Sequence, residues 1–410
     1  MKELLKKYLR GDTTLWLVFL FLCIISVIEM YSASSTLAYK AVNTTVPILR
    51  HVGFLFGGAL LVFFVHMIPY KYIRLLAYLG VILSIVLLIF VLLKGKSEND
   101  ATRWIEIFGI QFQPSELAKL CVIIVTADLI SRIKDKTTEK KYFLNILLML
   151  VIICPLILFE NFSTALLLFA VVFIMMFIGQ ISLKRLGILL MSLFAILVLA
   201  YFTIKTVPEA SMPKVFDRAY TWRARIDRYV SEKDKKTDKY VITDENRQVQ
   251  HGRIAIARGG VAGVFPGNSV ERDYLPQAYS DFIYAIIVEE MGLIGGIGVI
   301  LLYLILLFRA GMIALKSPTV FPALLVMGLS LMIVLQAFVS MAVATSLGPV
   351  TGQPLPLISR GGTSILITCI YFGIILGVTR QLKEEQIISN SLVEKEKKED
   401  IPVVKLEELN

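Results

Sequence analysis

Apolar runs of about 20 residues alternate with short polar segments along most of the chain. Because a bilayer core about 30 Å thick is crossed by about 20 residues of helix, each run predicts a membrane-spanning helix. With the ends placed at charges, prolines and glycines, the pattern predicts ten spans and an all-α polytopic integral membrane protein. The spans are expected at about 14–35, 48–68, 72–93, 114–132, 142–159, 163–181, 185–206, 281–308, 319–345 and 363–380.

Two segments fall outside this pattern. The stretch at about 207–280, between the seventh and eighth predicted spans, is predicted to be one large loop. Its charged middle, 231–246, is expected to be exposed and mobile, whereas 248–264 mixes apolar and polar positions and predicts a short surface helix. Residues 382–410 are charged and predict a flexible tail, so the membrane domain is expected to cover 1–381.

The composition supports a membrane protein and excludes other classes. Hydrophobic residues make up 56% of the chain, and the mean hydropathy is +0.73. The net charge of +10 does not indicate a nucleic-acid partner, because most basic residues flank apolar runs and no compact basic domain remains. The four cysteines lie in apolar runs and the three histidines are scattered, so neither a disulfide framework nor a metal-ligand cluster is predicted.

Lysine and arginine gather in alternate connections, and this sets the expected orientation. Short basic connections follow the second, fourth, sixth and eighth predicted spans, and such connections resist translocation. Together with the basic N-terminus they are assigned to the cytoplasm, which places both termini inside and 207–280 outside. That loop is also basic, but loops longer than about 60 residues are largely exempt from the rule. The first apolar run is expected to be retained, because no convincing signal-peptide cleavage site follows it.

The first stretch with chemical content combines Arg103-Trp104 with the helix-start pattern of residues 113–119. Pro114 suits the first turn of a helix, and Glu116 and Lys119, three residues apart, share one helix face. From the pattern alone, the favoured interpretation is a helix start with one stabilising ion pair.

The second stretch is a group of arginines in the predicted outer loop. Clustered guanidiniums suit phosphate or pyrophosphate, because the planar fork donates two hydrogen bonds to one anion. A solvated basic loop that meets anionic lipid headgroups explains the same residues equally well. The arginines are Arg218, Arg223, Arg225, Arg228, Arg253 and Arg258.

The third stretch surrounds Asp281, where the polar loop ends and the eighth apolar run begins. One interpretation is a helix start, with Ser280 as the N-cap and Asp281 complementing the helix dipole. The other is a functional carboxylate at the membrane boundary. Glu289 and Glu290 lie deeper in the run and differ by about 100° in direction, so one of them is expected to serve packing.

The fourth stretch, residues 348–364, precedes the last predicted span and contains three prolines and four glycines. Irregular backbone near membrane depth is tolerated only where it lines a cavity or is buried in protein. The predicted helix start at 361–364 also offers free backbone N–H groups to an anion. A tight re-entrant loop without a ligand is the alternative interpretation.

These four stretches, in this order over ten predicted spans, resemble the SEDS family (shape, elongation, division and sporulation), which includes RodA and FtsW. The resemblance covers nearly the whole membrane part and implies the SEDS fold. Residues 349–364 look like the family signature, and 103–119 and 281–292 look like further family motifs. Residues 265–276 look closer to the FtsW branch than to the RodA branch.

Family members are peptidoglycan glycosyltransferases that polymerise lipid II at the outer face of the bacterial cytoplasmic membrane. Their partners are a class B penicillin-binding protein, which is the transpeptidase, and other division or elongation membrane proteins. The resemblance implies the same activity, location and partners here, and it matches Asp281 to the family's catalytic aspartate. The substrate-binding residues that it implies are Arg103, Trp104, Glu116, Lys119, Arg258, Ser359, Arg360, Gly361, Gly362, Thr363 and Ser364.

The chemistry expected from this resemblance is an inverting glycosyl transfer with Asp281 as general base. The leaving diphosphate needs charge neutralisation more than protonation, and Arg103, Lys119, Arg360 or the loop arginines could supply it. No protein-bound metal is expected, and a Mg²⁺ or Mn²⁺ ion accompanying the lipid pyrophosphate is left open. Two other classes also stay open: a transporter that flips a lipid-linked precursor, and a non-catalytic scaffold for division proteins.

Two segments depart from the family pattern. Residues 160–166 lack its proline and carry the acid at a different position. Residues 276–279 lack the acid and the histidine that usually precede the catalytic aspartate. Asp281 is therefore the only acid that the sequence offers in that run.

Overall fold

The computed structural model describes residues 10–33, 46–94, 96–98, 101–107, 110–206, 224, 227, 242–243, 246–275 and 278–399. The helices are α2 (Thr13–Ala33), α4 (Val46–Val65), α5 (Tyr70–Lys94), α6 (Pro114–Ser131), α7 (Lys136–Glu160), α8 (Phe162–Ile178), α9 (Leu183–Thr206), α11 (Arg247–Gly259), α12 (Glu271–Tyr274), α13 (Ile283–Lys316), α14 (Val320–Ala344) and α15 (Thr363–Glu399). The strands are β1 (Lys96–Glu98), β2 (Ala101–Ile107) and β3 (Ile110–Phe112).

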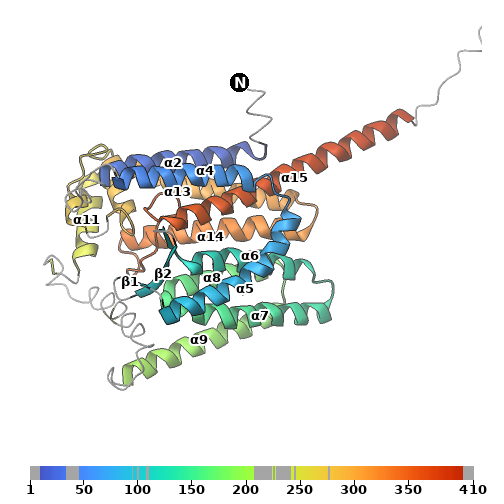
Figure 1. The fold of residues 1–410 in the computed structure, drawn as a ribbon, viewed down its shortest axis with the longest axis horizontal. Coiled ribbons are helices and arrows are strands. Elements are labelled where there is room, and N and C mark those ends of the chain that lie inside the picture. The colour runs from blue at the N-terminus through green and yellow to red at the C-terminus, as the bar shows by residue number, and fades with distance from the viewer. Residues whose placement is uncertain are drawn as a thin grey trace, which may run out of the picture.

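The long helices lie side by side in one bundle, with the strands and α11 gathered at one end (Figure 1). Helices α14 and α15 form its centre, since 78% of the apolar window of each is buried, against 11% for α9. The side chains of α9 therefore face mostly outwards, as expected for a helix in contact with lipid.

Eight described helices are long and apolar enough to cross a membrane: α2, α4, α5, α7, α9, α13, α14 and α15. The chain is thus an all-α multi-pass membrane protein, as predicted. Two further predicted spans coincide with helices that are too charged or too short to be counted among these eight. Helix α6 carries Glu116, Lys119 and Asp128, and α8 has 17 residues. The count of ten spans remains a prediction.

The connection at 94–113 contains a small sheet that the sequence analysis did not predict. The strand order is β1-β2-β3, and both pairs are antiparallel. Its last strand leads through Gln113 into α6, where Pro114 occupies the first turn. The expected helix start at this point is confirmed, and the sheet places β2 beside it.

The surface helix predicted at 248–264 is confirmed as α11, although it ends at Gly259. Gly260 has a φ of +52°, which an α-helix cannot continue. The charged middle expected at 231–246 lies outside the described residues except for 242–243 and 246. At the other end of the chain, α15 continues to Glu399 through the segment for which we expected a flexible tail.

Helix α13 breaks at Gly292, and the break is used to bind the segment after α11. Gly292 has φ 67° and ψ −172°, so two carbonyls and two N–H groups leave the helical ladder of α13. All four are satisfied by residues 260–265 instead. The N–H groups of Val264 and Phe265 donate to the carbonyls of Glu289 (3.0 Å) and Glu290 (2.8 Å), and the N–H groups of Leu293 and Ile294 donate to the carbonyls of Gly260 (3.0 Å) and Val261 (3.3 Å).

Candidate functional site

Asp281 lies in a turn before α13 and not in the helix itself. Helix α13 begins at Ile283 with Phe282 as its N-cap residue, and its first turn contains no acid. The Ser280 hydroxyl does not cap the helix but donates a hydrogen bond to Asp281 Oδ1 at 3.0 Å. Ser280 is therefore not the N-cap of α13, and Asp281 lies outside its first turn.

The loop between α14 and α15, residues 348–362 and here called the signature loop, is tied to the turn that carries this carboxylate. The Ser359 hydroxyl donates a hydrogen bond to the Ser280 carbonyl at 2.7 Å. The Arg360 N–H donates to the Tyr279 carbonyl at 2.9 Å, and the Arg360 guanidinium lies 5.2 Å from the centre of the Tyr279 ring. Two segments far apart in sequence thus form one surface.

Gly352 brings the backbone of the signature loop between Asp281 and Arg103. Its φ of +69° is a left-handed conformation that favours glycine. A methyl group built on Gly352 would lie 3.6 Å from Asp281 Oδ2 and 3.8 Å from Arg103 Nη1. Arg103 is anchored from β2, since its Nε donates to the Glu160 carbonyl at 3.0 Å, and the half-buried Trp104 follows it. A carboxylate and a guanidinium therefore converge on one point of the loop.

The residues at the start of α15 close the same end of the bundle. Thr363 is the first helical residue, and its hydroxyl donates to the Gln111 carbonyl of β3 at 2.8 Å. The N–H of the buried Ser364 donates to the Gly361 carbonyl at 2.8 Å, and Gly362 has a φ of +49°. The small sheet is thereby fixed to the end of the signature loop.

Lys119 and Glu116 form a buried support beneath the signature loop. Lys119 has no exposed surface, and its Nζ lies 2.7 Å from Glu116 Oε1 and 3.0 Å from Gln336 Oε1. Gln336 in turn donates to the Pro354 carbonyl at 3.2 Å. The ion pair therefore acts on the site through Gln336, and direct contact of either residue with substrate remains a prediction.

Arg258 lies outside this group of contacts and faces Glu289, with 3.6 Å between Nε and Oε1. Glu289 also accepts hydrogen bonds from the Ser269 hydroxyl and from the Val270 N–H at 3.1 Å. Glu290 accepts from the Ser32 hydroxyl of α2 and from the Ser269 N–H at 3.4 Å. Both glutamates thus hold the segment after α11 against the bundle, whereas the sequence led us to expect packing from one of them.

The remaining arginines of the second stretch divide between described and undescribed parts of the chain. Arg253 Nε donates to the Ser346 hydroxyl at 3.2 Å, close to the start of the signature loop. The arginines at positions 218, 223, 225 and 228 lie outside the described residues.

Three contacts of the signature loop were missed by the sequence analysis. Besides the Gln336 contact, Gln353 Nε2 donates to the Thr164 hydroxyl at 2.6 Å, and the Tyr303 hydroxyl donates to the Pro356 carbonyl at 2.6 Å. The available signal was a polar group inside an apolar run, because such a group must find a partner when it is buried. Gln336 and Tyr303 both match that signal.

The electrostatics of the site favour an anion. Burial lowers the pKa of the Arg360 guanidinium, and the neighbouring Tyr279 acts in the opposite direction. Because a guanidinium stays charged at neutral pH, Arg360 remains a partly desolvated cation beside the Asp281 turn. Among the described residues no group of three or more His, Cys, Asp or Glu side chains could hold a metal ion. A Mg²⁺ or Mn²⁺ ion that arrives with a pyrophosphate remains a prediction.

A helical bundle that carries a carboxylate, two guanidiniums and a proline- and glycine-rich loop at one end defines a multi-pass membrane protein with a candidate acid–base and anion-binding site. The chain belongs to the cell cycle protein family of FtsW, RodA and SpoVE, whose model matches residues 12–384. The resemblance to the SEDS family is thereby confirmed.

Similar proteins agree with this assignment. The chain is 31% identical over 337 residues to a probable peptidoglycan glycosyltransferase FtsW of Hahella chejuensis, with 80% of each chain covered. It is also 31% identical over 366 residues to a protein of the same name from Geobacter sp. M18, covering 87% of this chain and 93% of that one. One similar solved structure is a peptidoglycan synthase complex described for its structural coordination of polymerization and crosslinking. A chain of that complex matches with a TM-score of 0.68 at 25% identity, covering 91% of this chain and 98% of that one. The rod shape determining protein RodA of Thermus thermophilus gives a TM-score of 0.63 at 25% identity, covering 90% and 97%.

Proposed function

We propose that this chain is a peptidoglycan glycosyltransferase that polymerises lipid II into glycan strands. The observation that carries the proposal is the convergence of Asp281 and Arg103 on Gly352 of the signature loop. Family membership and the names of the similar proteins supply the reaction class. An acid–base group and a cation that face one point are what transfer to a sugar hydroxyl from a diphosphate-linked donor requires.

In the proposed reaction Asp281 accepts the proton of the acceptor sugar hydroxyl. The freed oxygen attacks the anomeric carbon of the donor, and the bond from that carbon to the diphosphate oxygen breaks with inversion. The electron pair leaves with undecaprenyl pyrophosphate, whose charge Arg103 and Arg360 neutralise. A divalent cation bound to the pyrophosphate would share that task.

The proposal includes a location and a partner. The site end of the bundle faces the outer side of the bacterial cytoplasmic membrane, with both termini in the cytoplasm, because the short basic connections lie at the other end. The similarity to a chain of a peptidoglycan synthase complex supports a class B penicillin-binding protein as the transpeptidase partner. A role in division is favoured over elongation by the names of the FtsW relatives.

The test is polymerisation of lipid II by the purified protein together with its penicillin-binding protein. Asp281→Asn should reduce glycan polymer on a gel by about 10²- to 10⁴-fold, the usual contribution of a general base. Asp273→Asn is the matched control, because this carboxylate is 48% exposed on the preceding segment and should leave activity unchanged. Equal polymer from wild type and Asp281→Asn would refute the role of Asp281. Translocation of lipid II without polymer would refute the function.

A further inference from the structure

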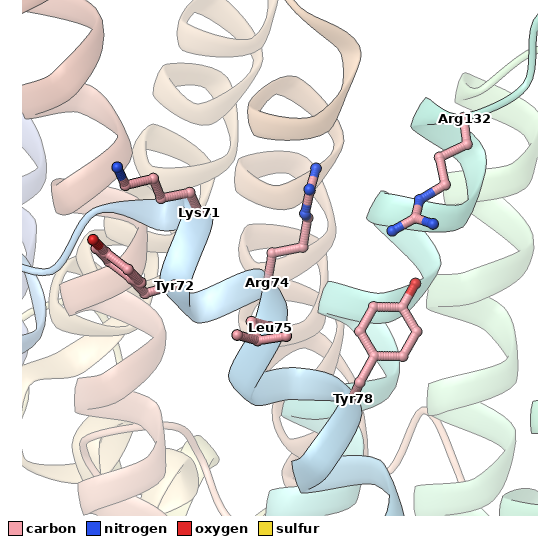
Figure 2. Close-up of a pocket in the computed structure, with 6 residues that line it drawn as sticks. All are labelled: Lys71, Tyr72, Arg74, Leu75, Tyr78 and Arg132. Atoms are coloured by element: carbon pink, nitrogen blue, oxygen red, sulfur yellow. The ribbon is translucent and has the colours of Figure 1, made fainter.

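A second polar site lies at the opposite end of the bundle from Asp281. It is a cavity of 370 Å³ between the start of α5 and the end of α6. Figure 2 shows the side chains of α5 and the guanidinium of Arg132, the residue directly after α6, around it. The lining residues are Lys71, Tyr72, Arg74, Leu75, Tyr78 and Arg132.

The charge of this cavity is strongly positive. Three of the six lining residues are cations and none is an acid. Within the part of the chain that the structure describes, the carboxylate in contact with these cations is Asp128, which is fully buried beneath the cavity. Its Oδ1 lies 3.5 Å from Arg74 Nη1, and its Oδ2 lies 2.6 Å from Arg132 Nη2 and 2.5 Å from the Tyr78 hydroxyl. One negative charge is thus shared between two guanidiniums, and Lys71 adds a further positive charge.

The shared carboxylate holds the Arg132 guanidinium at 2.6 Å. The Arg74 guanidinium lies 3.5 Å from the other carboxylate oxygen and 5.7 Å from the centre of the Phe321 ring. A guanidinium has five N–H donors, and the contact with Asp128 occupies only part of them. The Arg74 side chain is 47% exposed and that of Arg132 is 45% exposed, so the remaining donors are accessible. Two guanidiniums that share one carboxylate fit the oxygens of a phosphate. The Lys71 ammonium, 5.0 Å from the centre of the Tyr72 ring, adds positive charge at the rim of the cavity.

An apolar surface continues from the rim of the cavity along α5. Leu75, Leu79, Ile82 and Val86 follow one another at helical spacing and are 66%, 62%, 63% and 57% exposed. In a membrane-spanning helix such a row faces lipid tails. The basic residues of the cavity therefore lie at one end of an apolar surface that suits an acyl chain.

We infer that this cavity binds the phosphate headgroup of an anionic glycerophospholipid, with one acyl chain along the exposed face of α5. Basic pockets between helices at the cytoplasmic side of a membrane are suited to such headgroups, and the proposed orientation puts the cavity on that side. This cavity is separate from the Asp281 turn, so the proposed lipid binding does not depend on the proposed activity.

The experiment compares phosphatidylglycerol with phosphatidylcholine by native mass spectrometry of the full-length protein in detergent. Phosphatidylglycerol should bind more tightly than phosphatidylcholine. Lys71→Gln should raise the dissociation constant of phosphatidylglycerol about fivefold, which corresponds to the loss of about 1 kcal/mol per basic residue at an anionic surface. Lys71→Gln is preferred because Arg74 and Arg132 each neutralise the buried Asp128 and their loss could unfold the protein. Lys140→Gln, at an exposed lysine near the start of α7, is the matched control and should leave binding unchanged.

Two further arms identify the source of the phosphate. Leu79→Ser should weaken the binding of phosphatidylglycerol but not that of inorganic phosphate, because only the lipid has an acyl chain that extends along α5. Full displacement of the lipid by inorganic phosphate at equal concentration would refute the lipid assignment, and so would tighter binding of undecaprenyl phosphate than of phosphatidylglycerol. Equal effects of Lys71→Gln and Lys140→Gln would refute the site.

Discussion

The Ser359 hydroxyl donates a 2.7 Å hydrogen bond to the carbonyl of Ser280, the residue directly before Asp281. The same oxygen accepts the Leu355 N–H at 2.7 Å, so both of its bonds lie within the protein. Ser359 therefore positions the carboxylate through Ser280. Its predicted role in binding substrate is not needed to explain these contacts.

Ser359→Ala should lower the polymerisation rate about 10- to 100-fold, because small displacements of a reacting group have effects of this size. The half-saturating lipid II concentration should change little, since Ser359 acts on the position of Asp281. Rates measured over a range of lipid II concentrations separate the two effects, and Ser359→Thr, which keeps the hydroxyl, should recover part of the rate. A higher half-saturating concentration at unchanged maximal rate would instead support direct substrate binding.

Lys119→Met should destabilise the protein by about 3 to 5 kcal/mol, because it leaves the Glu116 carboxylate buried without its cation. The complete burial of Lys119 makes this loss of stability accompany any loss of activity. The measurement is the thermal unfolding midpoint in detergent, alongside polymer yield. The double variant Lys119→Met with Glu116→Gln should be more stable than the single one. If the single variant unfolds at the wild-type temperature, the support role of the pair is wrong.

The sequence predicted the long helices well because their lengths are set by the apolar runs themselves. The start of α6 was also predicted, since proline is favoured in the first turn of a helix and Pro114 stands there. The sheet was missed because its strands have 3, 7 and 3 residues and are stabilised by pairing with one another. Such short strands leave no period long enough to detect.

The candidate site was predicted in its parts but not in its arrangement. Motif resemblance singled out Arg103, Asp281 and the signature loop, yet their meeting at Gly352 depends on how three distant segments pack. Local pattern also left two interpretations of Asp281 equally acceptable. The structure places the first turn of α13 after Asp281, with Phe282 and not Ser280 as the N-cap residue, while the catalytic role of Asp281 stays a prediction.

Gly292→Ala should destabilise the contact between α13 and the segment after α11. The residue has a φ of +67°, and a methyl group there would lie 2.2 Å from the Val261 carbonyl oxygen. We expect a loss of about 1 to 3 kcal/mol from the backbone conformation alone. Limited proteolysis near Val261 should then become faster, and the unfolding midpoint should fall.

Gly298→Ala is the matched control for Gly292→Ala, because Gly298 lies in the same helix with no atom within 4 Å of an added methyl group. It should be neutral or slightly stabilising, since alanine favours helix by about 1 kcal/mol over glycine. Equal proteolysis of both variants would show that the break at Gly292 does not hold this segment.

Asp12 and Arg309 predict a pH dependence of stability at the other end of the bundle. Arg309 contacts Asp12 Oδ2 through Nη2 at 2.6 Å and Nε at 2.7 Å, while the Thr14 N–H donates to Oδ1 at 3.0 Å. Burial by itself would raise the pKa of Asp12, but the hydrogen bonds and the charge of Arg309 outweigh it and hold the pKa below its ordinary value of 3.8. A carboxyl with a lowered pKa stabilises the folded state above its unfolded pKa and loses that contribution as pH falls through the folded value.

Asp12→Asn should therefore lower the free energy of unfolding by about 1.5 to 3 kcal/mol at neutral pH, the range for a hydrogen bond to a charged group. The difference from wild type should stay constant down to about pH 4 and shrink below it, as the wild-type carboxyl becomes protonated. Unfolding midpoints measured from pH 7 to pH 3 test this, with the exposed Glu385→Gln as the control that should show no difference at neutral pH. A gap between Asp12→Asn and wild type that stays the same at pH 3 would mean that packing around Asp12, and not its charge, stabilises the start of α2.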